Sequence, residues 1–328
     1  MDCMDIRKGN SVSFGVDEAV QQLRALRQAG LHSRRPDGHP PSLPSRVVLA
    51  QVVDGLAAAL FPHWLGKPDL CAENIDHYVG YTLDLTLSAL HQQVRRELLY
   101  LSGERLLSET DGRRAIEIIQ AFSRDLVTVR ELLDTDVEAA FQGDPAANSV
   151  DEVLVSYPGV WAMIHHRFAH LLYRQGMKLT ARLMSELAHS ATGIDIHPGA
   201  QIGSHFFIDH GTGVVIGETA IIGRRVRLYQ AVTLGAKRFA QAEDGSLVKG
   251  EPRHPIVEDD VVIYAGATVL GRVTIGRGSV IGGNVWLTRS VEPGSMVSQA
   301  LAVTAPEVEV VKMQTDDVDA ELWKAFGI

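Results

Sequence analysis

The stretch Val257–Leu287, VEDDVVIYAGATVLGRVTIGRGSVIGGNVWL, decides the fold, because a large aliphatic residue recurs in it at every sixth position. An amphipathic helix does not keep a period of six over such a length. A six-residue repeat is typical of a parallel β-helix, in which each hexapeptide supplies one short strand and one turn. Three hexapeptides close one triangular coil, and the recurring residue points into the prism. Here these residues are Val257, Ile263, Val269, Ile275, Ile281 and Leu287.

The same period occurs in two earlier registers, nearer the N-terminus. Their members are again aliphatic residues six positions apart: Ile196, Ile202, Ile208 and Val214, then Ile216, Ile222, Leu228 and Leu234. Glycine follows many of these residues, which suits a tight corner where a positive φ is costly for other residues. The repeat therefore covers about a hundred residues, beginning near Gly193.

A polar segment interrupts the repeat once, between Leu234 and Val257. We expect residues 236–253 to leave the coil as an extruded loop. A long loop in a compact repeat scaffold is usually functional or disordered. This loop ends in Arg253, His254 and Pro255, which favours a function.

The N-terminal half has helical periodicity instead, and predicts amphipathic helices near 76–103, 112–141, 159–175 and 179–190. The sequence thus predicts an α+β protein with an all-helical domain followed by a parallel β-helix. Its expected parts are an N-terminal extension with a Pro-rich linker (1–45), the helical domain (46–192), the β-helix (193–300) and a C-terminal tail (301–328).

Composition excludes several classes of function. The formal net charge of the 328 residues is -9, which argues against a nucleic-acid or anionic-membrane partner. The two cysteines, Cys3 and Cys71, form no CxxC pair, so neither a disulfide framework nor a cysteine zinc site is expected. No signal-peptide core or membrane-spanning run is present. A cytoplasmic protein without a bound metal is the prediction.

An ionisable pair stands in the run IDHGTG, residues 208–213. Burying Asp209 and His210 costs free energy unless both find partners, so a strand alone does not explain them. Asp195 lies fifteen residues earlier, somewhat under one coil of roughly 18 residues, and is expected near His210 across neighbouring coils. A carboxylate beside an imidazole fixes its tautomer and raises its basicity. Together with Arg253 and His254, these residues predict an active site.

Five segments together resemble the hexapeptide-repeat serine O-acetyltransferases. They are GIDIHPGAQIG, FIDHGTGVVIGET, LYQAVTLGAK, RHPIVEDDVVIYAGATVLG and VIGGNVW. The resemblance covers the C-terminal third closely and the helical half weakly. It implies a left-handed β-helix that transfers an acetyl group from acetyl-CoA to the hydroxyl of L-serine, a step of cysteine biosynthesis.

The resemblance also implies roles for individual residues. It makes His210 the general base, oriented by Asp195, with His254 in the same pocket. It makes Asp209 the ligand of the serine ammonium and Arg253 the ligand of its carboxylate, a geometry that suits a guanidinium. Two further residues are implied in the substrate pocket, Asp144 and Glu218.

Acetyl-CoA is implied as a co-substrate, with no tightly bound cofactor. Small residues that let its pantetheine arm approach the backbone are expected at Gly235, Ala236, Ala265, Gly266 and Gly283. The resemblance further implies a homotrimer or a dimer of trimers. It also implies binding of O-acetylserine sulfhydrylase through the C-terminal Ile328.

Three other interpretations stay open at this stage. In the first, the acceptor of the acetyl group is a sugar or another alcohol. A zwitterionic amino acid explains the presence of both Asp209 and Arg253 better. In the second, the chain is a zinc enzyme of the β-helix carbonic-anhydrase type, with His205 and His210 joined by His197 or His254. In the third, the chain is a non-catalytic scaffold. That interpretation gives no reason for the combination of Asp195, Asp209 and His210.

Overall fold

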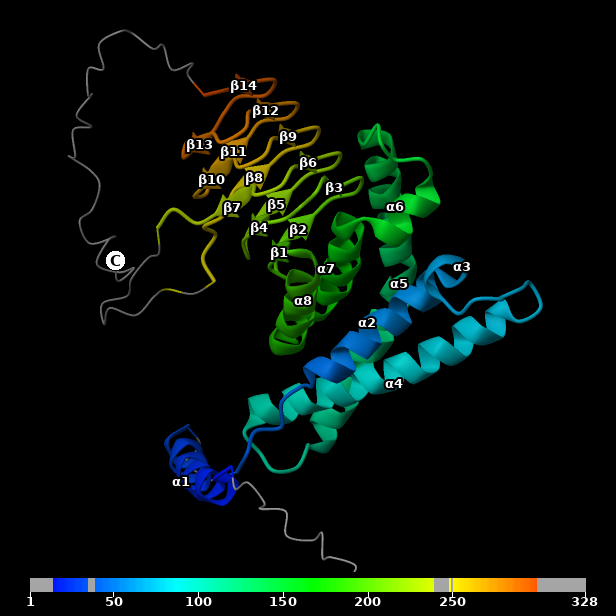
Figure 1. Ribbon diagram of the computed structural model, residues 1–328, viewed down its shortest axis with the longest axis vertical. Coiled ribbons are helices and arrows are strands. Elements are labelled where there is room, and N and C mark those ends of the chain that lie inside the picture. Colours follow the sequence, from blue (N-terminus) through cyan, green and yellow to red (C-terminus); the bar gives the residue numbers. More distant parts are fainter. Residues whose placement is uncertain (1–13, 35–38, 239–247, 249, 300–328) are drawn as a thin grey trace, which may run out of the picture.

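The computed structural model describes residues 14–34, 39–238, 248 and 250–299, and has helices in its N-terminal half and a prism of short strands in its C-terminal half (Figure 1). This order confirms the predicted fold class. Cys3, Ile328, most of the predicted loop and the predicted tail lie outside the described residues. The four segment boundaries stay predictions.

The helices are α1 (Val16–Arg34), α2 (Arg46–Leu60), α3 (Pro62–Leu65), α4 (Ile75–Ser102), α5 (Glu109–Gly143), α6 (Val150–Ser156), α7 (Pro158–Arg174) and α8 (Lys178–Thr192). Local sequence explains several starts. Ser45, Ser108 and Ser149 cap α2, α5 and α6, because each side chain accepts a hydrogen bond from a backbone N–H of the first turn. Pro158 occupies the first turn of α7, where its missing N–H has no cost.

Helix α1 forms, but it buries none of its side chains. Its larger apolar residues are half exposed or more, with Val20 at 50%, Leu23 at 52% and Leu26 at 68%. Helices α2, α4, α5, α7 and α8 instead share one continuous core with the prism. None of the helices in the described part is long and apolar enough to cross a membrane.

The prism has three parallel sheets. Sheet A contains β1 (Asp195–Ile196), β4 (Val215–Ile216), β7 (Thr233–Gly235), β10 (Thr268–Leu270) and β13 (Trp286–Leu287). Sheet B contains β2 (Gln201–Ile202), β5 (Ile221–Ile222), β8 (Ile256–Val257) and β11 (Thr274–Ile275). Sheet C contains β3 (Phe207–Ile208), β6 (Arg227–Leu228), β9 (Val262–Ile263), β12 (Val280–Ile281) and β14 (Met296–Val297).

The sixth-position residues form the prism core, as the period predicted. They lie directly above one another in the strand register, for example Ile196 on Ile216 and Ile208 on Leu228. All are buried except Ile202 and Leu287, which are partly buried. The glycines that directly follow sixth-position residues, such as Gly203, Gly217 and Gly223, do not have the predicted positive φ. A Cβ on any of them would overlap atoms of a neighbouring segment, so close packing explains these glycines.

A buried ion pair joins the helical half to the first coil. Arg167 of α7 binds Asp136 of α5 at 3.0 Å, and the same guanidinium donates to the carbonyl oxygens of Ile202 and Gly203. The carboxylate of Asp136 also accepts the backbone N–H of Phe206. Burial raises the pKa of Asp136 to about 6, and the charge of Arg167 opposes this rise. Together, the hydrogen bonds of Arg167 and of the Phe206 N–H hold α5 and α7 against the prism.

Close packing completes this junction. Gly159, in the first turn of α7, lies against β3, and a Cβ at this position would overlap the carbonyl oxygen of Ile208. Gly193, with φ of 71°, caps α8 and turns the chain into β1. The active-site candidates on the first coils are therefore held against a rigid helical frame.

Candidate active site

The predicted site residues occupy two corners of the prism. The His210 corner, residues 209–213, joins β3 of sheet C to β4 of sheet A. The His254 corner, residues 217–220 with 253–255, joins sheet A to β5 and β8 of sheet B. Sheet A lies between the two corners, a span of roughly 20 Å if six residues each rise ~3.3 Å.

The His210 corner is open to solvent. His210 has φ of 57°, so the backbone turns its side chain outward, where 71% of it is exposed. Its Nδ1 lies 4.0 Å from Oδ1 of Asp209, whose side chain is only 15% exposed. The backbone N–H of Asp209 donates to Leu228 and so anchors the corner to the next coil. An exposed imidazole beside a shielded carboxylate can exchange protons with a substrate.

The helical half contributes Asp144 to this corner. Asp144 ends α5, and its carboxylate accepts hydrogen bonds from the Tyr157 hydroxyl at 2.5 Å and from the Ala146 N–H at 2.8 Å. The hydrogen bond from Tyr157 is the main cause that lowers the pKa of Asp144, and the charges of His210 and Arg227 act in the same direction. The hydrogen bond to Asp144 also raises the pKa of Tyr157 to about 12. Asp144 is thus ionised and close to the predicted base.

The His254 corner is closed by hydrogen bonds. Glu218 accepts from the Tyr173 hydroxyl at 2.7 Å and from Nη2 of Arg253 at 2.5 Å. Partial burial alone would raise the pKa of Glu218, but these two hydrogen bonds lower it overall. Arg272 reaches across the corner and donates to the carbonyl oxygens of Thr219 and His254.

The protonation state of His254 follows from its partners. Its Nδ1 accepts the backbone N–H of Thr219 at 3.1 Å, so the ring proton must lie on Nε2. Burial, followed by the charge of Arg253, lowers the pKa of His254 to about 4. The ring lies against Gly217, where a Cβ would overlap it. His254 is therefore a neutral donor through Nε2 and not a base.

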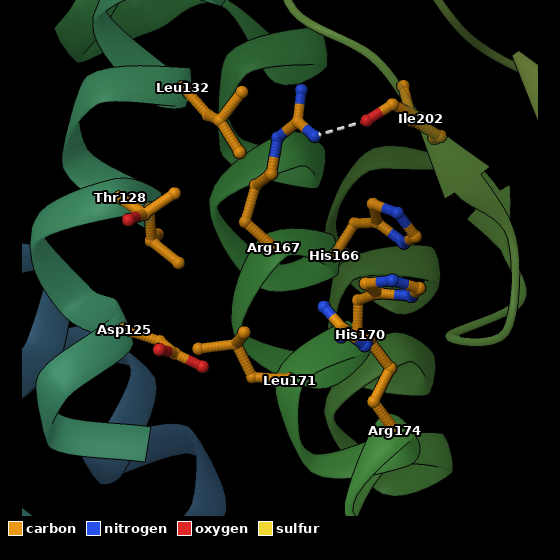
Figure 2. A pocket seen from close by; sticks show the side chains of 10 residues that line it. Asp125, Thr128, Leu132, His166, Arg167, His170, Leu171, Arg174 and Ile202 are labelled. Atoms are coloured by element: carbon orange, nitrogen blue, oxygen red, sulfur yellow. Dashed lines mark hydrogen bonds between the residues drawn. The ribbon is translucent and has the colours of Figure 1, made fainter. Parts of the chain in front are cut away.

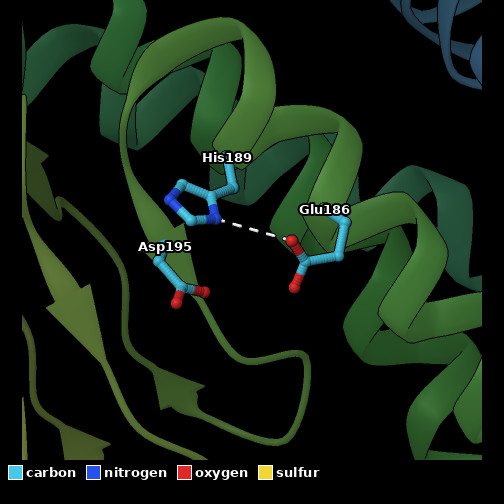
Figure 3. Close-up of side chains that lie close together, drawn as sticks. All are labelled: Glu186, His189 and Asp195. Atoms are coloured by element: carbon cyan, nitrogen blue, oxygen red, sulfur yellow. Dashed lines mark ion pairs between the residues drawn. The ribbon is translucent and has the colours of Figure 1, made fainter.

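Asp195 points elsewhere in this structure. Within the described part of the chain, no hydrogen bond or ion pair joins Asp195 to His210. Its carboxylate lies instead beside Glu186 and His189 of α8 (Figure 3). The expected orienting role of Asp195 stays a prediction.

The residues predicted to contact CoA also divide between the corners. Ala265 and Gly283 follow β9 and β12, and so occupy the same corner position as His210 in later coils, with Gly266 beside them. Gly235 and Ala236 end β7 at the opposite edge of sheet A. Gln230 has the corner position of His210 in the next coil, so the first group forms a row of small side chains that begins one coil further along the prism.

Sequence reasoning missed several partners in these corners. They are Tyr157, Tyr173, Thr219, Arg227 and Arg272. His197, named before only as a possible zinc ligand, packs edge-on against Tyr173. Thr219 carried a usable signal, because it follows Glu218 directly in the resembling segment FIDHGTGVVIGET. The two tyrosines carried none, since they lie on α7 or at its start, far from the repeat in sequence.

The structure does not assemble the zinc site of the alternative interpretation. His205 lies before β3 and His210 after it, at different corners. Among the described residues, the group of three potential metal ligands that comes together is Glu186, His189 and Asp195.

A cavity of about 390 Å³ lies between α5 and α7, away from both corners (Figure 2). His166, His170 and Arg174 line it from one face of α7, opposite Asp125. His166 is 2% exposed, and burial lowers its pKa well below the usual value. His166 therefore packs as a buried neutral ring between α7 and the first coil.

Comparisons with known proteins agree over most of the chain. The family profile described as bacterial transferase hexapeptide (six repeats) matches residues 254–289. The protein named serine acetyltransferase, plasmid, of Synechococcus elongatus is 54% identical over 293 residues, which are 88% of this chain and 92% of that protein. A serine acetyltransferase of Mycobacterium tuberculosis is 49% identical over 162 residues, 49% of this chain and 67% of that protein.

Solved structures give the same picture. Serine acetyltransferase 1 of Entamoeba histolytica in complex with L-cysteine is similar with a TM-score of 0.66 and 39% identity, over 76% of this chain and 86% of that chain. Isoform 3 from the same organism, in complex with cysteine, has a TM-score of 0.62 and 36% identity, over 80% of this chain and 83% of that chain.

Proposed function

The chain belongs to the serine acetyltransferase family, and we propose that its two charged corners together form the site of acetyl transfer to L-serine. It is an acyltransferase of cysteine biosynthesis, with acetyl-CoA as the acetyl donor that the family implies. The observation that carries the proposal is the pairing of an exposed imidazole at one corner with a pre-formed guanidinium and imidazole at the other.

His210 acts as the general base. It takes the proton from the serine hydroxyl while the serine oxygen attacks the thioester carbonyl carbon. The tetrahedral intermediate then expels the CoA thiolate, which receives the proton from His210, so that O-acetyl-L-serine and CoA leave. A positioned base of this kind accelerates attack by roughly 10²–10⁴-fold. The thioester is already activated, and no redox step is involved.

The charges around the site match a zwitterion. Asp209 and the ionised Asp144 hold the ammonium group of serine, and Arg253 holds its carboxylate through a guanidinium fork. Glu218 keeps Arg253 in place by accepting its hydrogen bond at 2.5 Å, and the Tyr173 hydroxyl in turn donates to Glu218 at 2.7 Å. A sugar needs neither charge. Cysteine carries the same two groups, so it competes for the same charges.

His254 serves as a donor. Its neutral ring has Nε2–H available, which is suited to the thioester oxygen or the departing group. Asp195 orients His210 when the carboxylate turns from α8 toward the corner. The small residues Ala265, Gly266 and Gly283 let acetyl-CoA lie along the prism edge, while Gly235 and Ala236 line the same groove from the other corner.

This arrangement requires more than one chain. The two corners of a single prism face away from each other across sheet A, so a site that uses both needs a second copy. A threefold assembly places the His254 corner of one chain beside the His210 corner of the next, and repeats this contact identically. We therefore propose a homotrimer, with the dimer of trimers as the larger alternative.

Two further expectations carry over from the sequence. Ile328 binds the active site of O-acetylserine sulfhydrylase, although it lies outside the described residues. The cytoplasm is the proposed compartment. Deletion of Ile328 tests the first: unchanged binding of the sulfhydrylase contradicts it.

The test of the substrate uses analogues that lack one charge. CoA release from acetyl-CoA is measured with L-serine, with serine methyl ester and with N-acetylserine. We expect release with L-serine and a large loss with each analogue. Arg253→Met abolishes the preference for L-serine over its methyl ester, and Asp209→Asn abolishes the preference over N-acetylserine. Equal rates with all three acceptors, or release only with a sugar, contradict the proposal.

A further inference from the structure

Three potential metal ligands meet where the last turn of α8 passes into the first strand of the prism (Figure 3). Glu186 and His189 lie three positions apart on α8, so their side chains share one helix face. The turn at Gly193 then brings Asp195 of β1 back toward that face. None of the three takes part in the hydrogen-bond networks of the two corners.

The distances suit a single ion. The ligating atoms of the three side chains all lie within 4.8 Å of one another. Nδ1 of His189 is 3.5 Å from Oε2 of Glu186. The side chains of His189 and Glu186 are 45% and 33% exposed, so an ion can enter from solvent. Two carboxylates and one imidazole form a mixed oxygen and nitrogen set and not merely an acidic patch.

The neighbouring cations leave the ligand atoms free. Arg182 binds Oε1 of Glu186 at 2.5 Å, so Oε2 stays directed at His189. Arg46 donates to the carbonyl oxygen of Glu186 and to the Ser190 hydroxyl, and holds the end of α8 without touching the carboxylate. An outer arginine that orients a carboxylate is the usual support of a metal ligand.

Asp195 is the unsatisfied member. In the described residues its carboxylate makes no hydrogen bond or ion pair, although it lies beside a second carboxylate. A divalent cation held between this carboxylate and that of Glu186 would supply the charged partner that Asp195 lacks. The structure therefore brings three ligand atoms together, and among the described residues no hydrogen bond or ion pair engages the carboxylate of Asp195.

We propose that Glu186, His189 and Asp195 bind a divalent transition-metal ion, with water completing its coordination. The ligand types favour Zn²⁺, since imidazole and carboxylate are both common zinc ligands and water fills an open position. The ion holds Asp195 on α8 and withdraws it from His210. Metal binding therefore slows acetyl transfer, a consequence that rests on the proposed orienting role of Asp195.

Metal binding is tested first, without substrates. The full-length chain is stripped with a chelator and titrated with Co²⁺, whose visible absorption reports coordination by nitrogen and oxygen ligands. We expect about one tightly bound ion per chain, displaced by Zn²⁺. His189→Ala and Glu186→Gln weaken this binding at least about tenfold. The matched control is His77→Ala on α4, an exposed histidine outside the cluster, which leaves binding unchanged. Equal binding by wild type and His189→Ala overturns the site.

Regulation is tested second, with acetyl-CoA and L-serine. The rate is followed by loss of the thioester absorbance, because a thiol reagent would compete for the metal. Zn²⁺ lowers the rate of the wild type and EDTA restores it, whereas His189→Ala keeps its rate at the same Zn²⁺ concentration. Tight binding without inhibition overturns the regulatory role. Absence of any serine-dependent reaction contradicts the proposed function and leaves the binding result standing.

Discussion

The His210 corner and the His254 corner are built on the same repeat, yet their histidines differ in almost every property. The ring of His210 is exposed, and it pairs with a carboxylate oxygen of Asp209 that lies 4.0 Å away. The ring of His254 is 7% exposed, accepts a hydrogen bond through Nδ1 and lies on a glycine. The first ring is free to take a proton, and the second is fixed as a neutral donor.

The difference comes from what covers each corner. Helices α5 and α7 reach the His210 corner only at its side, through Asp144 and Tyr157, and leave the ring in solvent. At the His254 corner, Glu218, Thr219 and Arg272 enclose the ring with hydrogen bonds. One scaffold thus supplies a base and a donor by varying burial and hydrogen bonding, as catalytic pairs of equal side chains often do.

The largest effect on the rate is expected when the exposed imidazole of His210 is removed. His210→Ala lowers kcat by roughly 10²–10⁴-fold, because the serine hydroxyl loses its base. The melting temperature changes little, since 71% of the side chain is exposed. His210→Asn is the matched control for the backbone, because Asn tolerates a positive φ. A kcat within tenfold of the wild type in both variants contradicts the role of the base.

The second-largest effect is expected when the imidazole ring of His254 is displaced but not removed. Gly217→Ala places a methyl group where the ring of His254 lies, so the ring must move. A displacement of about 1 Å costs on the order of 10²-fold in rate. Gly112→Ala on α5 meets nothing within 4 Å and is the control, with unchanged kcat. Steady-state kinetics check both, and equal activity of the two variants would remove His254 from the mechanism.

The sequence predicted the core of the prism well. The sixth-position aliphatic residues gave the prism core, because burial of a periodic residue depends only on local spacing. The motifs IDHGTG and RHP lie at two corners of the prism, next to β3 and β8, and their role as a site stays a prediction. The packing of His254 on Gly217 and its hydrogen bond from Thr219 join segments 35 residues apart. No local pattern encodes such contacts.

Asp195 shows a different limit. Its spacing from His210 placed both near the start of sheet A, but the direction of a side chain depends on what surrounds it. Here Glu186 and His189 of α8 lie beside it, and the hexapeptide repeat does not predict that these residues are its neighbours. Apart from Asp144, the helical half was predicted only as helices, and no residue of α8 was expected beside Asp195.

The pH dependence of stability separates the two corners further. Burial lowers the pKa of His254 to about 4, whereas an unfolded histidine titrates near about 6.5. Between these values the unfolded chain binds more protons at this site, so stability falls as the pH falls. Chemical denaturation should show that the wild type loses up to about 3 kcal/mol more than His254→Gln between pH ~6.5 and ~4. Parallel curves for the two proteins contradict the buried neutral ring.

The smallest effect belongs to the third corner, where no site residue was predicted. Arg225 and Asp260 stack across neighbouring coils at 2.6 Å, with side chains 50% and 38% exposed. Exposed pairs of this kind contribute about 0.2–1 kcal/mol. Arg225→Ala therefore lowers the free energy of unfolding by less than about 1 kcal/mol and leaves kcat unchanged. A larger loss of activity would show that this corner also takes part in the reaction.

The central claim, that one site combines the His210 corner of one chain with the His254 corner of another, is tested most directly by mixing two inactive variants. His210→Ala and Arg253→Met chains with different tags are co-expressed, and assemblies that carry both tags are purified. Every mixed cyclic trimer has one site of three in which both residues are intact, so about a third of the wild-type activity should return. If both corners instead act within one chain, every site lacks a residue, and mixed assemblies no more active than their parents would contradict the account.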